Sequence, residues 1–455
     1  MTYSTLIFAS VVLPLSILFL FFDRSSEYKN LILCITSFLF VTWGINILAG
    51  LMFLSVFVDY FFALAIENMM KKDKSRAVVF FVFDIIVNAA LFLWLAKNGI
   101  FGEGGKLHLD RVYIPVGAAF YTLKNFSYVY DVFTGRCKAE RNPFYLLTYG
   151  MSYPFMLAGP VVRYGDIAPQ LRKRSLSGEL ISRGIKSFAI GFSKTVILLP
   201  VLDKIRTAAL YGEESSPVSA LVGILAWLGY VWFTFTGLSD MGTGIACMNG
   251  FDVPLNYERL TSKHLLGGTV RCYNTSMVEF MKDIRGDSGK IKPVILTLVL
   301  SVLGAGFYGS SKTFLIVGAI VGVILAAEYI VGYDRIEDIP SPVKAVIGFI
   351  SVIMLFSPLA FETFGGWKSW LGDLVNFGSF LSVGDELKTL LVGNFLIIAV
   401  CIISVTPISS VLTGALDSAA ERSPKSYTFI NTIKTICIAA VFAVSYILLA
   451  ADKLA

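Results

Sequence analysis

Long apolar runs separated by short polar loops recur along the whole chain. A helix needs about 20 apolar residues to cross the hydrocarbon core of a bilayer. The windows that meet or approach this length are Thr5–Phe22, Leu31–Gly50, Leu51–Met70, Val78–Ala96, Val294–Tyr308, Phe314–Val331, Val343–Phe361, Leu390–Thr406 and Ile430–Ala450. Apolar and polar residues do not alternate with a period of two, so the windows predict helices rather than the strands of a membrane barrel.

Less continuous windows at Tyr113–Val132, Tyr145–Val162, Ile185–Leu199 and Val218–Phe235 raise the total. The sequence therefore predicts an all-α polytopic membrane protein with about 11–13 membrane-embedded helices. We expect one membrane domain over residues 1–455. Composition agrees, because 56% of the 455 residues are hydrophobic, only 15% are charged, and the mean hydropathy is +0.72. Soluble proteins are about a quarter charged.

The net charge of +6 is spread over short loops, where it reports orientation rather than nucleic-acid binding. The loop Met70–Ala77 holds four basic residues against one aspartate and is the best candidate for the cytoplasmic side. Counting helices from this loop places the N-terminus outside. The first apolar segment lacks the features of a cleaved signal peptide and is expected to be retained. The six scattered cysteines give no metal-binding pattern.

A second basic loop breaks this count. The six basic residues within Arg163–Lys186 should also be cytoplasmic, yet only the segment Tyr145–Val162 separates them from the preceding cytoplasmic loop. That segment contains Pro154, Gly159 and Pro160, which suit a broken helix shielded by protein. We therefore expect a re-entrant element here, with a full span and an exception to the charge rule as the alternative.

Several motifs follow one another between Pro115 and Leu171. They are Pro115–Thr122, Ser127–Gly135 (SYVYDVFTG), Lys138–Asn142 (KAERN), Ala158–Tyr164 (AGPVVRY) and Pro169–Leu171 (PQL). A second block runs from Gly237–Met241 (GLSDM) through Gly244 to Asn249–Arg259 (NGFDVPLNYER). In this order they resemble the membrane-bound O-acyltransferase family, in particular the bacterial branch of alginate and cellulose O-acetylation and teichoic-acid D-alanylation. The resemblance covers residues 1–330 and is weaker over 331–455.

The resemblance implies a bundle of helices, some re-entrant, around a central funnel. It also implies a cell-envelope polysaccharide as acceptor and, if the protein is active, an acyl thioester as donor (acyl-CoA or an acyl carrier protein). No bound cofactor is implied. Residues matching the motifs are candidates for the funnel or the donor site. They are Arg163, Ser239, Asp240, Arg271, Tyr273, Asn274, Ser276 and Tyr308.

Three of these candidates also have plainer interpretations. Arg163 suits either the phosphate of a donor or the lipid headgroups. Ser239 and Asp240 follow an apolar stretch that ends at Phe235, so they suit either a functional site at membrane depth or a structural contact. Asp59 and Asp84 also lie within apolar windows, and the sequence alone gives them no role.

The catalytic half departs from the family pattern. The family places one histidine shortly after the P-x-N-F-x-R element, and here that position is Asn274. It places a second histidine in a later helix, and here that position is Val321. Histidine suits the abstraction of a proton from an acceptor hydroxyl because its pKa lies near neutrality. The absence of these histidines does not depend on how the sequences are aligned, since no histidine follows His264.

Substitutes for the lost base are weak. Glu328 lies seven residues after Val321, about 10 Å along a helix, whereas a base must approach its proton to about 3 Å. Tyr308, Asp240 and Glu279 have no supporting pattern. His108 and His264 lie in loops and are expected to be ordinary loop residues.

Three functional hypotheses remain. The first is a catalytically degenerate family member that acts as a partner, scaffold or acyl-handling subunit, beside an active paralogue or a periplasmic acyltransferase. The second is an active O-acyltransferase with a rearranged base. The third is a small-molecule transporter, which the helix count allows and the motifs oppose.

Overall fold

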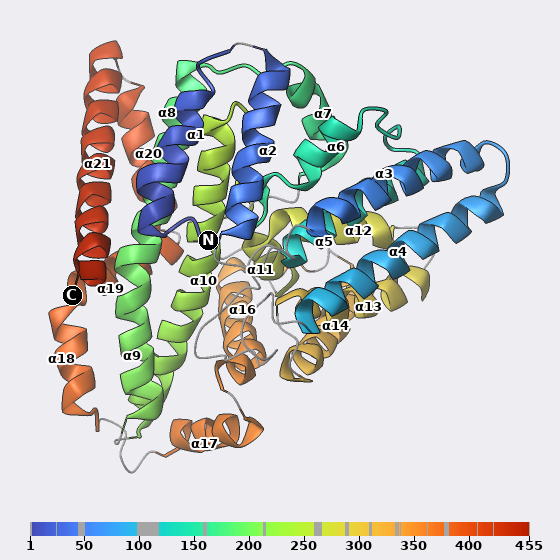
Figure 1. Cartoon of the computed structure of the whole chain (residues 1–455). Coiled ribbons are helices and arrows are strands. Elements are labelled where there is room, and N and C mark those ends of the chain that lie inside the picture. The colour runs from blue at the N-terminus through green and yellow to red at the C-terminus, as the bar shows by residue number, and fades with distance from the viewer. Residues whose placement is uncertain are drawn as a thin grey trace. The chain divides into compact units, whose positions relative to one another are not determined.

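The computed structural model describes residues 2–23, 25–43, 51–97, 118–157, 162–212, 215–258, 266–286, 291–308, 312–332, 336, 338–361, 363–376, 382–406, 408–421 and 423–454. Within these ranges nearly all residues are helical and no strand occurs (Figure 1). The first helices are η1 (Phe8–Val12), α1 (Leu13–Phe19), α2 (Ser26–Thr42), α3 (Leu51–Met70), α4 (Lys74–Lys97), α5 (Ala118–Thr134), α6 (Pro143–Gly150), η4 (Tyr153–Phe155), α7 (Tyr164–Arg172) and α8 (Gly178–Ser193).

The later helices follow in the same order. They are η5 (Lys194–Leu198), α9 (Leu199–Tyr211), α10 (Pro217–Met248), α11 (Leu266–Tyr273), α12 (Thr275–Arg285), α13 (Ile291–Tyr308), α14 (Lys312–Val331), α16 (Ser341–Phe356), η6 (Ser357–Ala360), α17 (Phe364–Leu374), α18 (Asp385–Gly393), α19 (Phe395–Val405), α20 (Ile408–Ala420) and α21 (Pro424–Leu454).

Six helical stretches among the described residues are long and apolar enough to cross a membrane. They are Met52–Met70, Gly178–Tyr211, Pro217–Met248, Thr313–Val331, Ser341–Ala360 and Pro424–Ala451. The pair α18 and α19, bent by 71° at its break, makes a seventh if it is one span. The prediction of an all-α polytopic membrane protein is confirmed. The larger predicted total also counted shorter apolar helices, such as Phe8–Phe19 and Ile291–Gly306.

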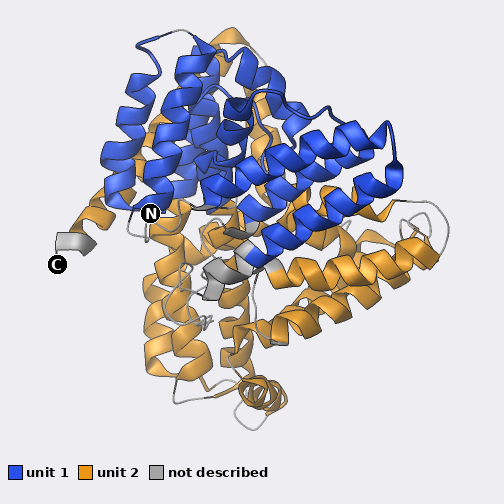
Figure 2. Ribbon diagram, turned by 45° about the vertical axis from the view of Figure 1, so that its right-hand side comes forward, with its two compact units in different colours: residues 1–106, 114–192, 238–256 blue, residues 107–113, 193–237, 257–455 orange. Residues whose placement is uncertain are grey.

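Contacts divide the chain into two compact units (Figure 2). Unit 1 comprises residues 1–106, 114–192 and 238–256, and unit 2 comprises residues 107–113, 193–237 and 257–455. The predicted grouping of residues 1–455 in a single membrane domain stays a prediction.

Unit 1 contains a hairpin of α3 and α4, against which α5 packs. Phe81 of α4 stacks on Phe133 of α5 with ring centroids 4.5 Å apart. In the same unit, α8 and α10 approach closely. A Cβ on Gly244 would lie 2.6 Å from the backbone nitrogen of Phe188, and one on Gly184 would lie 2.6 Å from the backbone oxygen of Gly244. Small residues at such a crossing are typical of helices packed in a membrane.

The segment Tyr145–Val162 is broken, as its prolines and glycine indicate. The helix α6 ends at Gly150, η4 makes a single turn that contains Pro154, and α7 begins at Tyr164. Residues 158–161, with the predicted breakers Gly159 and Pro160, lie outside the described residues. The observed helices are too short to span a bilayer. Their side of the membrane, and the re-entrant path, stay predictions.

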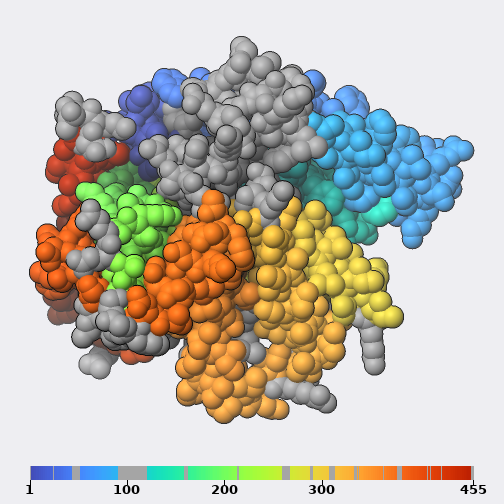
Figure 3. Space-filling model, turned by 90° about the horizontal axis from the view of Figure 1, so that it is seen from below, coloured from blue at the N-terminus to red at the C-terminus, as the bar shows by residue number. Residues whose placement is uncertain are grey.

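Unit 2 contains a helical hairpin of α13 and α14 and an apolar core. In the hairpin of α13 and α14, a Cβ on Gly318 would lie 2.6 Å from the Cβ of Ala305, so the helix backbones approach closely. The helix α14 also packs against α16. Figure 3 shows α13, α14 and α16 side by side on one face, coloured yellow to orange. The long helix α21 is largely exposed along its apolar length, as expected for a helix surrounded by lipid.

Candidate functional site

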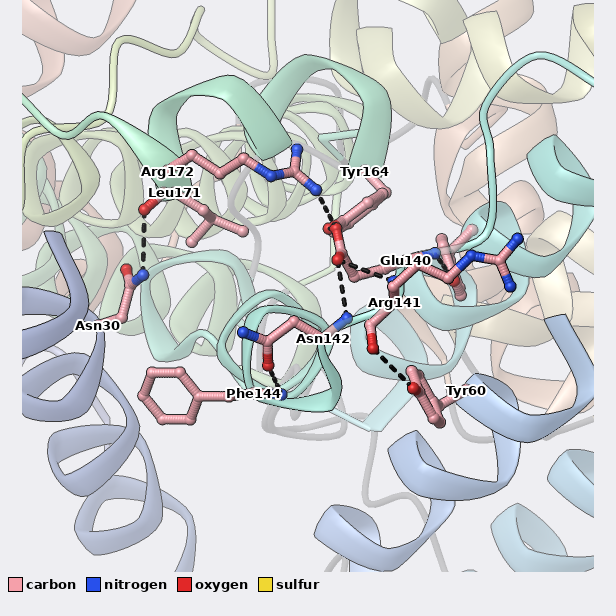
Figure 4. A network of polar contacts seen from close by, with 10 residues as sticks. Asn30, Tyr60, Glu140, Arg141, Asn142, Phe144, Tyr164, Leu171 and Arg172 are labelled. Atoms are coloured by element: carbon pink, nitrogen blue, oxygen red, sulfur yellow. Dashed lines mark hydrogen bonds and ion pairs between the residues drawn. The ribbon is translucent and has the colours of Figure 1, made fainter. Parts of the chain in front are cut away.

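Glu140 of the KAERN motif is the centre of a polar network in unit 1 (Figure 4). Its carboxylate accepts hydrogen bonds from the backbone N–H groups of Arg141 (2.8 Å) and Asn142 (2.9 Å). It also accepts from the hydroxyl of Tyr164 and pairs with the guanidinium of Arg172. The Glu140 side chain is 5% exposed, so these four donors replace the water that a buried carboxylate has lost. Residues up to 32 positions apart in the chain therefore meet at one carboxylate.

Arg163 pairs with Asp131, which belongs to the preceding motif. A guanidinium nitrogen of Arg163 lies 2.6 Å from a carboxylate oxygen of Asp131, whose side chain is buried. The structure thus gives Arg163 a partner that neither sequence interpretation foresaw, and its contact with a donor phosphate or with headgroups stays a prediction.

Burial, followed by the negative charge of Asp131, raises the pKa of the neighbouring Cys137 thiol to about 12. Cys137 is therefore a neutral thiol and a poor nucleophile at physiological pH.

The second motif block of unit 1 is tied to the first through Asp252. The side-chain oxygen of Gln170 accepts from the backbone N–H of Asp252 (2.8 Å), and its side-chain nitrogen donates to the Asp252 carbonyl (3.3 Å). Arg174 lies 4.1 Å above the ring of Phe251. Gly250, which precedes Phe251 and Asp252, has a φ of +84°. A Cβ at this position would lie 2.9 Å from both Arg174 Cγ and the Ser175 carbonyl oxygen. Only glycine fits this turn without strain.

Ser239 and Asp240 are placed by a longer helix than the sequence predicted. The apolar window ends at Phe235, yet α10 continues without a break to Met248, so both residues lie within it. The Ser239 hydroxyl accepts from the backbone N–H of Asn256 (3.3 Å). The Asp240 carbonyl accepts from the hydroxyl of Ser187 (2.9 Å). Both residues are buried, and these contacts are structural.

Asn274, in unit 2, caps a helix. Its side-chain oxygen accepts from the backbone N–H of Met277 at the start of α12 (3.1 Å) and from the hydroxyl of Ser276 (3.4 Å). Tyr273 stacks on Phe235 with ring centroids 4.5 Å apart. The position at which the family has a histidine is therefore occupied by a buried N-cap residue, a common role for asparagine.

Arg271 lies between two carboxylates. Its guanidinium is 3.2 Å from Glu279 and 3.6 Å from Glu258, and all three side chains are about half exposed. Between Arg271 and Tyr273 lies Cys272, whose thiol pKa is raised to about 11, chiefly by burial and then by Glu258. Cys272 is therefore protonated at neutral pH and is a weak nucleophile.

Val321, at the other histidine position, belongs to the apolar core of unit 2. It is 7% exposed and clusters with buried residues that include Trp227 and Ile353. Val270 of α11 packs against this cluster, and its carbonyl accepts from the backbone N–H of Asn274 (3.4 Å). The segments that carry Asn274 and Val321 therefore pack near each other. The central funnel implied by the family resemblance stays a prediction.

Glu328 also joins α14 to α11. Its carboxylate accepts from the backbone N–H of Gly267 (3.2 Å), and a Cβ on Gly267 would lie 2.5 Å from that carboxylate. The side chain of Tyr308 and both histidines, His108 and His264, lie outside the described residues. Sequence reasoning missed Asp131, Glu140 and Gln170 as positioning residues, although each is a polar residue inside a motif already singled out.

Comparison with known proteins agrees with the motifs. The chain is 26% identical over 371 residues to the probable alginate O-acetylase AlgI of Pseudomonas aeruginosa, covering 78% of this chain and 71% of the relative. It is 26% identical over 408 residues to the protein of the same name from Pseudomonas syringae, covering 85% and 76%. It is 23% identical over 376 residues to the peptidoglycan O-acetyltransferase of Helicobacter pylori, covering 72% and 70%. No family model matches the chain.

The chain is related to the membrane-bound O-acyltransferases. The resemblance read from the motifs is thereby confirmed. The relatives are named for the transfer of acetyl groups to cell-envelope polymers. In this chain, the contacts above show that the motifs of unit 1 form a polar framework, whereas Asn274 and Val321 of unit 2 have structural roles.

Proposed function

We propose that this protein is a catalytically degenerate membrane-bound O-acyltransferase that serves in the O-acetylation of a cell-envelope polymer. The relationship to alginate and peptidoglycan O-acetyltransferases supports the process. The observation that carries the degeneracy is that Asn274 is used as a helix cap while Val321 is buried in the apolar core. The protein would lie in the bacterial cytoplasmic membrane with its N-terminus outside.

The chemistry explains why these two residues matter. Transfer to a hydroxyl needs a group that accepts its proton at about 3 Å or through one water molecule. Valine has no lone pair, and an asparagine amide is not a base at neutral pH. Two candidate carboxylates in unit 2 are engaged, since Glu328 accepts from a backbone N–H and Glu279 pairs with Arg271 and Lys282.

A protein without a base still contributes to such a system as a partner. It would hold or position an active paralogue or a periplasmic acyltransferase, or handle the acyl group on its way to the polysaccharide. Its other contacts would be with membrane lipid. If the chain does transfer acyl groups, the donor would be an acyl thioester, either acyl-CoA or an acyl carrier protein.

The second candidate is an active transferase with a rearranged base. The observation in its favour is that two carboxylates, Glu258 and Glu279, gather at Arg271, three residues before Asn274 in the chain. Either carboxylate would need to leave Arg271 to accept a proton. This mechanism predicts a loss of about 10²–10⁴-fold in rate when the base is removed.

The test is transfer of labelled acetyl from a thioester donor to isolated envelope polymer by the protein in lipid vesicles. We expect no transfer above that of empty vesicles. In cells, Asn274→Ala, Glu279→Gln and Glu328→Ala should each leave polymer acetylation intact when the protein is made at normal levels. Asp417→Asn, an exposed carboxylate on α20, is the matched control. Loss of transfer in a well-expressed Glu279 or Glu328 variant would overturn the degenerate reading and support the second candidate.

A further inference from the structure

Two buried aspartates lie in the hairpin of unit 1 and share one asparagine as a neighbour. Asp59 of α3 and Asp84 of α4 are each 1% exposed, and the Asn88 side chain contacts both residues. The opposite faces of the same helices are apolar and open, with Phe61 of α3 and Ile86 of α4, each two residues from its aspartate, among the exposed side chains. The aspartates therefore point into the protein from helices whose outer faces suit lipid.

The pair lies near the middle of the expected membrane thickness. Asp59 is 11 residues before the end of α3 at Met70, and Asp84 is 10 residues after the start of α4 at Lys74. At 1.5 Å per residue both lie about 15 Å from the hairpin turn, which is half of a hydrocarbon core about 30 Å thick. Ionised carboxyl groups at this depth carry a large desolvation cost.

The chain supplies a donor for only part of the pair. The side-chain nitrogen of Asn88 donates to Asp59 Oδ1 (2.7 Å) and to the backbone carbonyl of Asp84 (3.1 Å). Asp59 Oδ2 and Asp84 Oδ1 are buried and have no hydrogen-bond donor. A buried polar atom left without a partner is costly, so these two oxygens indicate a missing positive group.

No basic side chain fills that place among the described residues packed around the pair. The helix α5 carries the titratable groups Tyr121, Lys124, Tyr128, Tyr130 and Asp131. The Lys124 nitrogen lies 5.3 Å from the ring centroid of Tyr149, in α6, and has no hydrogen-bond acceptor, so it does not pair with either aspartate. The Tyr121 hydroxyl bonds to Ser55 and to the Met52 carbonyl.

We propose that Asp59 and Asp84 form a site that binds one proton, held by the pair of carboxyl groups. Two buried carboxyl groups that share one asparagine neighbour repel each other when both are ionised in an apolar interior, and a single proton on the pair removes this repulsion. A metal cation fits less well, because Asn88 directs its NH₂ group, not its oxygen, at the pair. The site is independent of whether the protein transfers acyl groups.

Infrared spectroscopy of the purified protein in lipid tests the proposal, because a protonated carboxyl group has a C=O stretching band that a carboxylate lacks. We expect this band at neutral pH in the wild type, and its loss in the double variant Asp59→Asn/Asp84→Asn. The control Asp73→Asn removes a carboxylate at the exposed turn of the same hairpin, where Asp73 pairs with Arg76, and should retain the band. A spectrum unchanged in the double variant overturns the proposal.

Exchange of potassium for sodium separates the proton from a metal ion. The band should be insensitive to this exchange, and its loss on addition of sodium would overturn the proposal in favour of a sodium site. Chemical labelling of the wild type covers the case in which the double variant does not fold. Dicyclohexylcarbodiimide modifies protonated carboxyl groups in apolar surroundings. It should label one of the two aspartates, and the labelling should decrease as the pH is raised above neutral. A carboxylic-acid band that is absent from the wild type, together with no labelling at any pH, also overturns the proposal.

Discussion

The guanidinium of Arg163 lies 2.6 Å from the buried carboxylate of Asp131, 32 residues earlier in the chain. This ion pair joins the SYVYDVFTG motif, on α5, to the AGPVVRY motif at the start of α7. Nearby, Glu140 and Arg172 join the KAERN motif to the end of α7 in the same way. The residues that mark the family in this half of the chain are therefore held by one another, and their first role is to fix the geometry of unit 1.

A double-mutant cycle measures the Arg163–Asp131 pair. Arg163→Gln should destabilise the protein by about 3 kcal/mol, because it leaves the Asp131 carboxylate buried without its cation. Adding Asp131→Asn should restore most of the loss, since the two amides can bond to each other. Thermal unfolding in detergent is the measurement. Additive losses from the two substitutions would mean that the residues do not interact.

The Glu140 network should be far more sensitive than an exposed ion pair. Glu140→Gln puts an NH₂ group in reach of Tyr164 and Arg172, both of which are donors, and should cost about 3 kcal/mol. Glu67→Gln is the matched control, because Glu67 pairs with the exposed Arg141 and its loss should cost less than about 1 kcal/mol. Unfolding midpoints of the two variants side by side provide the comparison. Equal midpoints would contradict the central role of Glu140.

Alanine substitutions at two glycines with positive φ distinguish the destabilisation caused by backbone strain from that caused by steric crowding. Gly250→Ala should destabilise by about 2–4 kcal/mol, because the new methyl group meets Arg174 and the Ser175 carbonyl in addition to the strain of φ at +84°. Gly135 has φ of +78° but no atom within 4 Å of an added Cβ. Gly135→Ala should cost only about 1 kcal/mol. Expression level and unfolding temperature are the readouts, and a larger loss at Gly135 would refute the assignment.

The capping role of Asn274 predicts which substitutions at this position preserve the stability of the protein. Asn274→Ala should destabilise by about 1 kcal/mol, because the N–H of Met277 loses its acceptor at the start of α12. Asn274→Asp should be close to neutral, since aspartate is an equally good N-cap. The unfolding midpoints of the two variants are the measurement. Wild-type stability in Asn274→Ala would show that the hydrogen bond to Met277 does not hold the helix.

Hydrophobic length alone determined much of this protein. The window Leu51–Met70 coincides with α3, and Phe314–Val331 lies within α14, because a bilayer requires an uninterrupted apolar helix of that length. The absence of histidine after His264 was equally plain, since it depends on no contact at all. Polar residues inside motifs revealed the family, and proline at position 154 predicted the break between α6 and α7.

Only the tertiary structure decided how these polar residues are used. The apolar window Val218–Phe235 predicted a helix that ends at Phe235. The helix α10 instead continues to Met248, because Ser239 and Thr243 are buried against other parts of the chain. The partner side chains of Glu140, Arg163 and Asp59 lie 24 to 32 residues away in sequence. Sequence spacing determines which residues share a helix face. Which faces of different helices meet depends on tertiary packing, and this packing determines which partner a buried charge contacts.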